Sequence, residues 1–527
     1  MFKALFIAVA IIAHEPGYYT SLGKHLSRWL NQEGIKTTVS GPEKLAKSLQ
    51  NERAAFLIGF TNPSAAEMQE LRLFRQRGGK LVVFYSASPA LAELMGVKVL
   101  GYQEADYPGK WSKMNFAGAK IEGVPSSILQ TSTVLMRATP VAGKGRIIAT
   151  WADRTGKSTG DAAWIATKSG YWMTHVLLAD GDEELKGQLC AALLATIEPQ
   201  SWSYSTHKTV KQSKANVLID FAKAQKPRKG EIRAVWDHSG CGLYPGNWPK
   251  TIKLLQDSHM TDLYVNVAGA CFAHYPSAIL PQSKVYQKEG DQLAAALTAA
   301  KGTGIRVHAW VLCFSATRGT KDRLDIFKKR GWCLKDSRGK ELEYLDPSRA
   351  DVRSYMLEAI SEIVKKYPVA GIHLDFVRWG DKAEKPRNAA DYVSKFVAEA
   401  RGRVKRPKYL TCAVYGKHPE CVASVGQDWV GWLKAGNVDY VVPMDYCSTN
   451  EKFEELLKKQ SQYKAYAHHT IVGIGVTANE SRLDAKKVIE QIKLTRRYDF
   501  AGNALFDLDT TLEKNILPYL RMGVFSD

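Results

Sequence analysis

The chain has 527 residues, of which 45% are apolar and 24% charged, a composition typical of a globular protein with two or three domains. Its net charge of +20 is spread along the sequence, with local clusters at 223–233 and 401–408, and favours anionic partners such as acidic glycans. No nucleic-acid-binding motif accompanies the charge, so no nucleic acid partner is expected. The eight cysteines form no CxxC pair and have no zinc-type spacing, which argues against a disulfide-built fold.

The first 15 residues, MFKALFIAVAIIAHE, are open to two interpretations. One lysine before an apolar run is typical of a short signal peptide, with the Ala-Val-Ala at 8–10 as its cleavage site. The same run leads directly into a helix-like segment, which equally favours the first buried strand of a domain. Localisation therefore stays open between secreted or periplasmic and cytoplasmic. No later stretch is long and apolar enough to span a membrane, so no integral membrane segment is expected.

Residues 1–200 alternate strand patterns with amphipathic helix patterns, clearest at 21–34 and 66–79, which predicts an α/β domain with a mostly parallel sheet. The order of segments resembles the class I glutamine-amidotransferase-like (flavodoxin-like) domains. In that family a cysteine sits at a sharp turn after a central strand, whereas the stretch 80–90 here has Ser86 and no cysteine. We therefore expect a structural or binding domain without glutaminase chemistry. Its expected strands are 6–13, 35–39, 54–60, 80–86, 146–151, 162–167 and 172–179.

A helical, lysine-rich connector is expected at 201–230, and Pro227 with the basic residues around it marks a domain boundary. From Glu231 to the end at 527 the chain repeats a strand-helix unit eight times. Eight such units in roughly 290 residues predict a (β/α)8 TIM barrel. Its expected strands are 232–237, 262–269, 305–313, 369–377, 409–416, 438–446, 469–477 and 501–509.

The polarity of the barrel sequence changes abruptly in VAGIHLDFVRWGD, residues 369–381, where a buried strand pattern ends in Asp375 and Arg378. Active sites of (β/α)8 barrels lie at the C-terminal ends of the strands. Other strands of this barrel also end in carboxylates, imidazoles and aromatic rings, so these groups should converge on one rim. The residues expected to bind substrate there are Trp236, Asp237, Asn266, His308, Trp310, His373, Arg378, Tyr415, Lys417 and Tyr446.

Each of these side chains also has an ordinary structural explanation. The alternatives are core packing for Trp236 and Trp310, a buried hydrogen bond for His308, loop capping for Asp237 and Asp507, and a solvated surface charge for Lys417. The prediction of a site therefore depends on the convergence of many strand ends and not on any one residue.

Carboxylates and aromatic rings at one rim suit glycoside hydrolysis, in which one carboxylic acid protonates the leaving oxygen and a second carboxylate acts as nucleophile or base. Asp375 is predicted to be the nucleophile or electrostatic stabiliser, because Arg378 would keep it ionised. Asp445 follows the apolar residues 441–444, which predicts a raised pKa and the role of general acid. Asp507 is the reserve for either role. No cofactor and no metal are expected.

The segment GIHLDFVRW, with Asp375, resembles the GIHLDYVRYP motif of the bacterial family-10-like glycosyl hydrolases. This resemblance covers essentially all of residues 231–520. It implies a TIM barrel that acts on a polysaccharide or oligosaccharide. Some relatives cut peptidoglycan glycan strands that lack peptides. It carries over Asp375 as a catalytic position, whereas the position of Asp445 varies in such families. Further matching segments are IRAVWDHS, YVNVAGACFAHYPS, HAWV, LDPSRADVRSY, DWVGWL and VDYVVPMDY.

Two other functions compete with glycoside hydrolysis. The first is a non-catalytic glycan-binding protein that keeps the barrel cleft. The second is a metal-dependent hydrolase such as a deacetylase, for which the sequence lacks closely spaced histidine and aspartate ligands. The sugar, the linkage and the oligomeric state are left open by the sequence.

Overall fold

The computed structural model describes residues 9–14, 17–107, 109–153, 155–179, 182–318 and 320–526. The chain divides into two compact units, Met1–Lys214 and Ala215–Asp527. Each unit has hydrophobic cores of its own.

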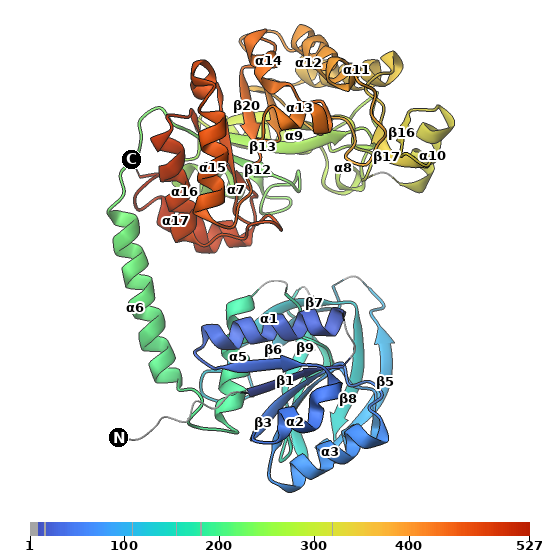
Figure 1. The fold of residues 1–527 in the computed structure, drawn as a ribbon, viewed down its shortest axis with the longest axis vertical. Coiled ribbons are helices and arrows are strands. Elements are labelled where there is room, and N and C mark those ends of the chain that lie inside the picture. Colours follow the sequence, from blue (N-terminus) through green and yellow to red (C-terminus); the bar gives the residue numbers. More distant parts are fainter. Residues whose placement is uncertain are drawn as a thin grey trace. The chain divides into compact units, whose positions relative to one another are not determined.

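A mixed sheet forms the centre of the first unit (Figure 1). Among the described residues it has nine strands in the order β2-β1-β3-β4-β11-β10-β9-β6-β7, while β5 and β8 pair separately. The strands are β1 (Val9–Ala13), β2 (Thr37–Ser40), β3 (Ala54–Ile58), β4 (Lys80–Phe84), β5 (Val97–Glu104), β6 (Trp111–Asn115), β7 (Ser127–Ser132), β8 (Val134–Pro140), β9 (Gly145–Ala152), β10 (Ser158–Thr167) and β11 (Gly170–Met173). The helices are α1 (Tyr18–Gln32), α2 (Leu45–Leu49), α3 (Ala65–Gln76), α4 (Pro89–Met95) and α5 (Glu183–Ala195), followed by α6 (Tyr204–Lys223), inside which the boundary between the units falls.

Helices cover both faces of this sheet, because successive residues of a strand point to opposite sides and both sides are apolar. In β1, Val9 and Ile11 pack in a core with residues of α1 and α5, whereas Ala10 and Ile12 pack in a second core with residues of α2, α3 and α4. The strand interpretation of the N-terminal run is therefore confirmed for 9–13, and residues 1–8 lie outside the described residues.

The expected mostly parallel sheet is only half right. Strands β2, β1, β3, β4 and β11 pair in parallel, but the pairs β11–β10, β10–β9, β9–β6 and β6–β7 are antiparallel. Strands β5 to β8 lie between 97 and 140, where no strand was expected. In β5 buried and more exposed residues alternate, as expected of a strand with one solvated face, and its apolar signal is correspondingly weak.

The second unit contains a parallel barrel. Within its described residues the strand order is β20-β19-β18-β15-β13-β12-β22-β21, and bridges from Val441 to Thr470 and from Met444 to Gly473 bring β20 and β21 together, so the barrel is nearly closed. The barrel strands are β12 (Ile232–Asp237), β13 (Asp262–Gly269), β15 (Arg306–Leu312), β18 (Gly371–Asp375), β19 (Tyr409–Val414), β20 (Tyr440–Pro443), β21 (Ile471–Gly475) and β22 (Gly502–Phe506). All eight lie within the ranges expected from the sequence.

Helices and short strands connect the barrel strands. The helices are α7 (Trp248–Asp257), α8 (Lys284–Glu289), α9 (Gln292–Ala300), α10 (Lys321–Lys329), α11 (Ala350–Lys366), α12 (Ala389–Arg403), α13 (Glu420–Val425), α14 (Trp429–Lys434), α15 (Asn450–Gln460), α16 (Ala485–Arg497) and α17 (Leu517–Leu520). The short strands are β14 (Phe272–Ala273), β16 (Cys333–Lys335) and β17 (Glu341–Leu345).

Alternation along the barrel strands divides the apolar residues between two layers. Trp236, Tyr264 and Trp310 belong to the inner core, which the strands enclose. Val235 and Leu263, their neighbours in sequence, belong to the larger outer core between strands and helices. Whether a polar strand residue faces the inside or the outside of the barrel therefore depends on its odd or even position along the strand.

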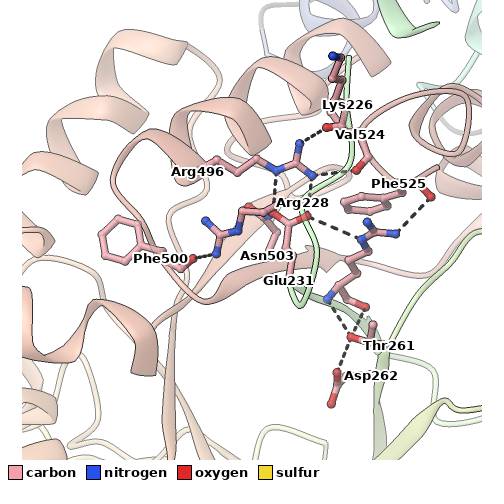
Figure 2. A network of polar contacts seen from close by, with 11 residues as sticks. Lys226, Arg228, Glu231, Thr261, Asp262, Arg496, Phe500, Asn503, Val524 and Phe525 are labelled. Carbon is pink, nitrogen blue, oxygen red and sulfur yellow. Dashed lines mark hydrogen bonds and ion pairs between the residues drawn. The ribbon is translucent and has the colours of Figure 1, made fainter. Parts of the chain in front are cut away.

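A polar network lies where the barrel strands begin (Figure 2). The Arg496 side chain on α16 donates to Glu231 Oε1 at 2.9 Å and Oε2 at 2.6 Å, and also to the backbone carbonyls of Lys226 and Val524 at 2.7 and 2.8 Å. Glu231 has a fully buried side chain and accepts a further hydrogen bond from Asn503 Nδ2 at 3.3 Å. The network thus fastens the connector before β12 and the C-terminal segment to the same end of the barrel.

Candidate active site

A pocket of about 440 Å³ lies at the opposite end, where the barrel strands finish. Side chains from the ends of five strands and from loops that follow barrel strands line it. They are Trp236, His238, Trp310, Leu312, Thr317, Arg318, Asp375, Phe376, Arg378, Ala413, Tyr415, Met444, Tyr446, Glu480 and Phe506.

Asp375, the last residue of β18, contributes a buried carboxylate to this pocket. It is 6% exposed. Its Oδ2 accepts a hydrogen bond from Trp310 Nε1 at 3.2 Å, and its Oδ1 accepts one from the Phe376 backbone N–H at 2.5 Å. Arg378 Nη1 lies 3.8 Å from Oδ1. The carboxylate is therefore held in place by donors on two strands and by one nearby cation.

Burial raises the pKa of Asp375 above its ordinary value, although Arg378, the hydrogen bonds from Phe376 and Trp310, and Arg318 all act in the opposite direction. Arg378 therefore acts in the expected direction, towards the ionised form, but the net shift of the pKa is upward. The guanidinium does favour the charged form, but loss of hydration outweighs it. A raised pKa is the property that a general acid needs.

The backbone turns sharply directly after Asp375. Phe376 has a φ of 48°, in the left-handed region that a bulky residue seldom adopts. Such local strain persists only where the surroundings hold it, and it is frequent at functional sites. Here the turn ends the strand so that Asp375, Phe376 and Arg378 all line the pocket.

Arg378 is itself 6% exposed and is placed between two aromatic rings. Its guanidinium carbon lies 4.1 Å from the centre of the Phe376 ring and 4.9 Å from that of Tyr415. Tyr415 in turn donates a hydrogen bond from its hydroxyl to Asp381 at 3.4 Å. Two residues predicted to bind substrate, Arg378 and Tyr415, thus lie in one stack at the wall of the pocket.

His238 and Arg318 form a second polar pair in the pocket. Arg318 Nη2 donates to His238 Nε2 at 2.6 Å, so this imidazole nitrogen is an acceptor. Burial and then the charge of Arg318 lower the pKa of His238, while Asp507 opposes them. His238 is therefore a neutral imidazole that orients Arg318.

Aromatic rings form the floor of the pocket. Trp236 is 1% exposed and Trp310 is 3% exposed, and both belong to the inner core. The Tyr446 and Phe506 rings are more exposed and stack with their centres 5.2 Å apart. The tryptophans thus combine packing with a small contact area in the pocket, and Tyr446 and Phe506 present more of their surface to it.

Asp445 does not line the pocket. Its neighbours Met444 and Tyr446 do, and alternation turns the residue between them to the other side. Asp445 Oδ2 accepts a hydrogen bond from Gln460 Nε2 at 2.8 Å, and Oδ1 has no hydrogen-bond partner among the described residues. A Cβ on Gly416 would lie 2.0 Å from Oδ1, so this glycine provides the space for the carboxylate.

The expected rise in the pKa of Asp445 is found: burial raises it to about 7. The structure nevertheless does not bring Asp445 and Asp375 together around one pocket.

The remaining predicted residues do not line the pocket. His373 accepts from Trp236 Nε1 at 2.9 Å, and burial lowers its pKa well below the ordinary value, so it is a neutral support for that ring. His308 pairs with Asp262 at 2.8 Å near the start of the strands.

Other predicted polar residues serve loops. Asp237 accepts hydrogen bonds from the backbone N–H groups of Gly240 and Gly242, Asn266 donates to the His238 carbonyl at 3.4 Å, and Asp507 accepts from the Thr477 hydroxyl at 2.5 Å. Lys417 is exposed.

Glu480 is the second carboxylate that lines the pocket, and the sequence analysis missed it. It is an exposed residue five positions beyond the end of β21. The sequence of its loop is typical of an ordinary polar surface. Only a survey of the acidic residues in every loop after a strand would have found Glu480. Arg318 was missed for the same reason, since it lies six residues beyond β15.

The described residues contain no group of three histidine, cysteine, aspartate or glutamate side chains that could hold a metal ion. Nor do they include a helix long and apolar enough to cross a bilayer.

The fold and the pocket define a TIM barrel with a buried carboxylate among aromatic rings at its C-terminal rim. Residues 231–392 match the family described as Glycosyl hydrolase-like 10. The glycosyl hydrolase YngK of Bacillus subtilis (strain 168) is 28% identical over 29% of this chain, and the match spans 34% of that relative, about a third of its length.

Among solved structures, the glycoside hydrolase domain of PgaB (BpsB) from Bordetella bronchiseptica is similar, with a TM-score of 0.44, 14% identity and coverage of 56% of this chain and 99% of that one. A catalytic domain of the Ostrinia furnacalis group II chitinase has a TM-score of 0.40, 12% identity and coverage of 56% and 95%. The family match over residues 231–392 thus supports a glycosyl-hydrolase-like barrel. The amidotransferase-like interpretation of the first unit stays a prediction.

Proposed function

We propose that the barrel unit hydrolyses O-glycosidic bonds of a glycan, with Asp375 as the general acid. The observation that carries this proposal is the position of Asp375, a buried carboxylate with a raised pKa at the end of β18, facing a pocket that also contains Glu480. Asp375 in its protonated form donates its proton to the glycosidic oxygen as the bond to the sugar breaks. This role replaces the nucleophile or stabiliser predicted from the sequence.

Glu480 supplies the second carboxylate in this proposal. As a carboxylate it attacks the sugar carbon or activates the water that does so. Its position on a loop allows it to approach a substrate seated on the rings of Tyr446 and Phe506. Asp445, the general acid expected from the sequence, has no direct part, because its carboxylate faces Gly416 and Gln460.

The alternative function is a glycan-binding protein that does not turn its ligand over. The same aromatic floor and arginines would serve it. Turnover separates the two functions, because a binding protein releases no new reducing ends.

The test compares the parent with Asp375→Asn, Glu480→Gln and Asp445→Asn on a panel of glycans that includes peptide-free peptidoglycan strands, with products identified by mass spectrometry. Asp375→Asn should lower kcat/KM by about 10²- to 10⁴-fold, the usual contribution of acid–base catalysis, and Glu480→Gln should also lower it strongly. Asp445→Asn makes the same chemical change outside the pocket and should stay close to the parent. Binding without cleavage by the parent would establish the non-catalytic alternative, and loss of cleavage in Asp445→Asn alone would restore Asp445 as the acid.

A further inference from the structure

A second pocket, of about 530 Å³, lies at the other end of the barrel, where β18 and β19 begin. The last turns of α11 and α12 and the connection 404–408, which leads into β19, form its wall. Among the described residues that line this basic groove there is no acid, whereas four are cations: Arg403, Lys405, Arg406 and Lys408. The basic cluster noted at 401–408 in the sequence is thus folded into one groove, at the opposite end of the strands from the candidate active site.

Most of this positive charge has no opposite charge within the protein. Arg406 Nη2 lies 3.2 Å from Asp439, but the same carboxylate lies 2.6 Å from Arg401 Nη1. Arg403 and Lys405 form no ion pair with any described residue. The helix macrodipole favours a cation at the end of α12, which accounts for Arg403 but for none of the residues that follow it.

Lys408 differs from an ordinary solvated surface lysine. Its Nζ donates a hydrogen bond to the Val369 carbonyl at 2.8 Å, and burial lowers its pKa. Val364 and Val369 line the same groove and limit the water around it. A cation that has lost hydration is stabilised by an anion that binds beside it. Lys408 therefore gains from a bound anion.

The cations at the mouth of the groove are accessible to a ligand. Arg403, Lys405 and Arg406 are all exposed. A concave surface lined by charges of one sign attracts ions of the other sign more strongly than a flat surface does. The groove therefore favours an anionic ligand that follows its wall.

The density of charge indicates which anion fits. Three cations without an acidic partner, Arg403, Lys405 and Lys408, share a volume that holds one drug-sized molecule. An acidic glycan usually carries a single carboxylate on a sugar ring, whereas a phosphate chain carries a charge on every phosphoryl group. Lysine and arginine both bind phosphate oxygens through charge-assisted hydrogen bonds. Closely spaced phosphates therefore match the groove better than the carboxylates of a glycan.

The groove offers no stacking surface for nucleic-acid bases, which single-stranded nucleic acids normally require. Tyr409 is the one aromatic residue among the described residues that line it. The Arg306 guanidinium carbon lies 5.5 Å from the centre of the Tyr409 ring, and the Tyr440 ring centre lies 5.9 Å from it. These contacts occupy the ring, so the groove favours a phosphate chain without bases.

We propose that the basic groove binds linear polyphosphate, with Arg403, Lys405 and Lys408 holding successive phosphoryl groups. The inference goes beyond the proposed function and does not depend on it, because the groove and the candidate active site lie at opposite ends of the barrel strands.

The experiment measures binding to the full chain by calorimetry at several salt concentrations, with sodium tripolyphosphate and long-chain polyphosphate as probes. The comparison anions are oligogalacturonate, oligothymidylate and phosphatidylglycerol vesicles, which represent an acidic glycan, a single-stranded nucleic acid and an anionic membrane. The variant Arg403→Gln/Lys405→Gln removes two exposed cations from the groove. The matched control Arg338→Gln/Lys340→Gln removes two exposed residues of the same types and spacing from the turn between β16 and β17, outside the groove.

Long-chain polyphosphate should bind the parent more tightly than any of the comparison anions. Arg403→Gln/Lys405→Gln should weaken this binding roughly 10-fold or more and lower the slope of log K against log salt by about 1 to 2, because fewer counterions are released. Arg338→Gln/Lys340→Gln should keep both the affinity and the slope of the parent.

Equal losses in the two double variants would overturn the inference, because they would indicate non-specific attraction to a protein with a net charge of +20. It would also be overturned if the parent bound no polyphosphate, or if a comparison anion bound as tightly and with the same dependence on Arg403 and Lys405. In that last case the anion concerned would identify the true partner as a glycan, a nucleic acid or a membrane. None of these measurements uses cleavage, so failure of the hydrolase proposal would leave them unchanged.

Discussion

Asp375 and Asp445 show how strongly the role of an aspartate depends on the direction in which its side chain points. Asp375 and Asp445 are both buried, and burial raises the pKa of both. Asp375 has donors from Trp310 and Phe376 and faces the pocket, while Asp445 has Gln460 alone and faces away from it. A perturbed pKa therefore indicates a catalytic residue only where the group also lies in a cavity that admits substrate.

The raised pKa of Asp445 predicts how stability changes with pH. In the unfolded chain this group ionises near its ordinary pKa of 3.8, but in the folded protein it keeps its proton up to about pH 7. Its contribution to stability is therefore fully present below about pH 4 and is lost as the pH rises towards 7, by roughly 4 kcal/mol in all. The Asp445→Asn variant has no ionisable group at this position, so it should show none of this loss of stability.

Urea unfolding of the parent and of Asp445→Asn at several pH values checks this prediction. The difference in unfolding free energy should move in favour of the variant between pH 4 and 7 and then level off. A difference that does not change with pH would show that Asp445 is already ionised in the folded protein.

At the scale of elements, the two ends of the barrel strands have different tasks. The C-terminal ends open into the pocket, and the N-terminal ends are closed by the network around Glu231 and Arg496 (Figure 2). Arg496 joins three segments of the chain: α16, the stretch from Lys226 to Glu231 that leads into β12, and the C-terminal segment at Val524. The closed end has no part in the proposed reaction, which fits the division of a TIM barrel into a stabilising and a catalytic face.

Arg496→Met should destabilise the barrel unit, because it removes the closer partner of a buried ion pair and leaves Glu231 only the longer contact with Arg233, at 3.7 Å. Breaking such a pair typically costs about 3–5 kcal/mol. The measurement is the free energy of unfolding by denaturant, with Arg497→Met as the matched control, since Arg497 pairs with Glu454 at the surface. Equal small losses in both variants would mean that the network does not hold the barrel together.

At the scale of the whole molecule, each unit has its own hydrophobic cores among the described residues. The cores of the first unit contain residues up to Trp202 and Tyr204, and those of the second begin at Leu218 and Ala222. The pocket and the network around Arg496 both lie within the second unit. The chemistry proposed here therefore needs no side chain from the first unit.

A fragment comprising residues 215–527 should consequently fold by itself and unfold cooperatively, because it contains its complete cores. Circular dichroism during heating checks this, with the full chain measured alongside. The fragment should also keep any glycan cleavage of the full chain and its dependence on Asp375. A fragment without a cooperative transition would show that the barrel depends on the first unit.

The sequence by itself determined the barrel, because its strands are buried on both sides and appear as apolar runs at regular spacing. It also determined that Asp375 reaches the pocket, since a carboxylate at the end of a buried strand in a barrel lies at the C-terminal rim. It determined less of the first unit, where β5 to β8 are too weakly apolar to be recognised and the antiparallel half of the sheet was missed.

Only the tertiary structure decided which polar groups meet. Asp445 does not line the pocket because alternation turns its side chain outward. Glu480 and Arg318 line it from loops whose path no local pattern encodes. The direction in which the pKa of Asp375 shifts was also decided there, since the loss of hydration on burial outweighs the attraction of Arg378, and burial is a property of the folded chain.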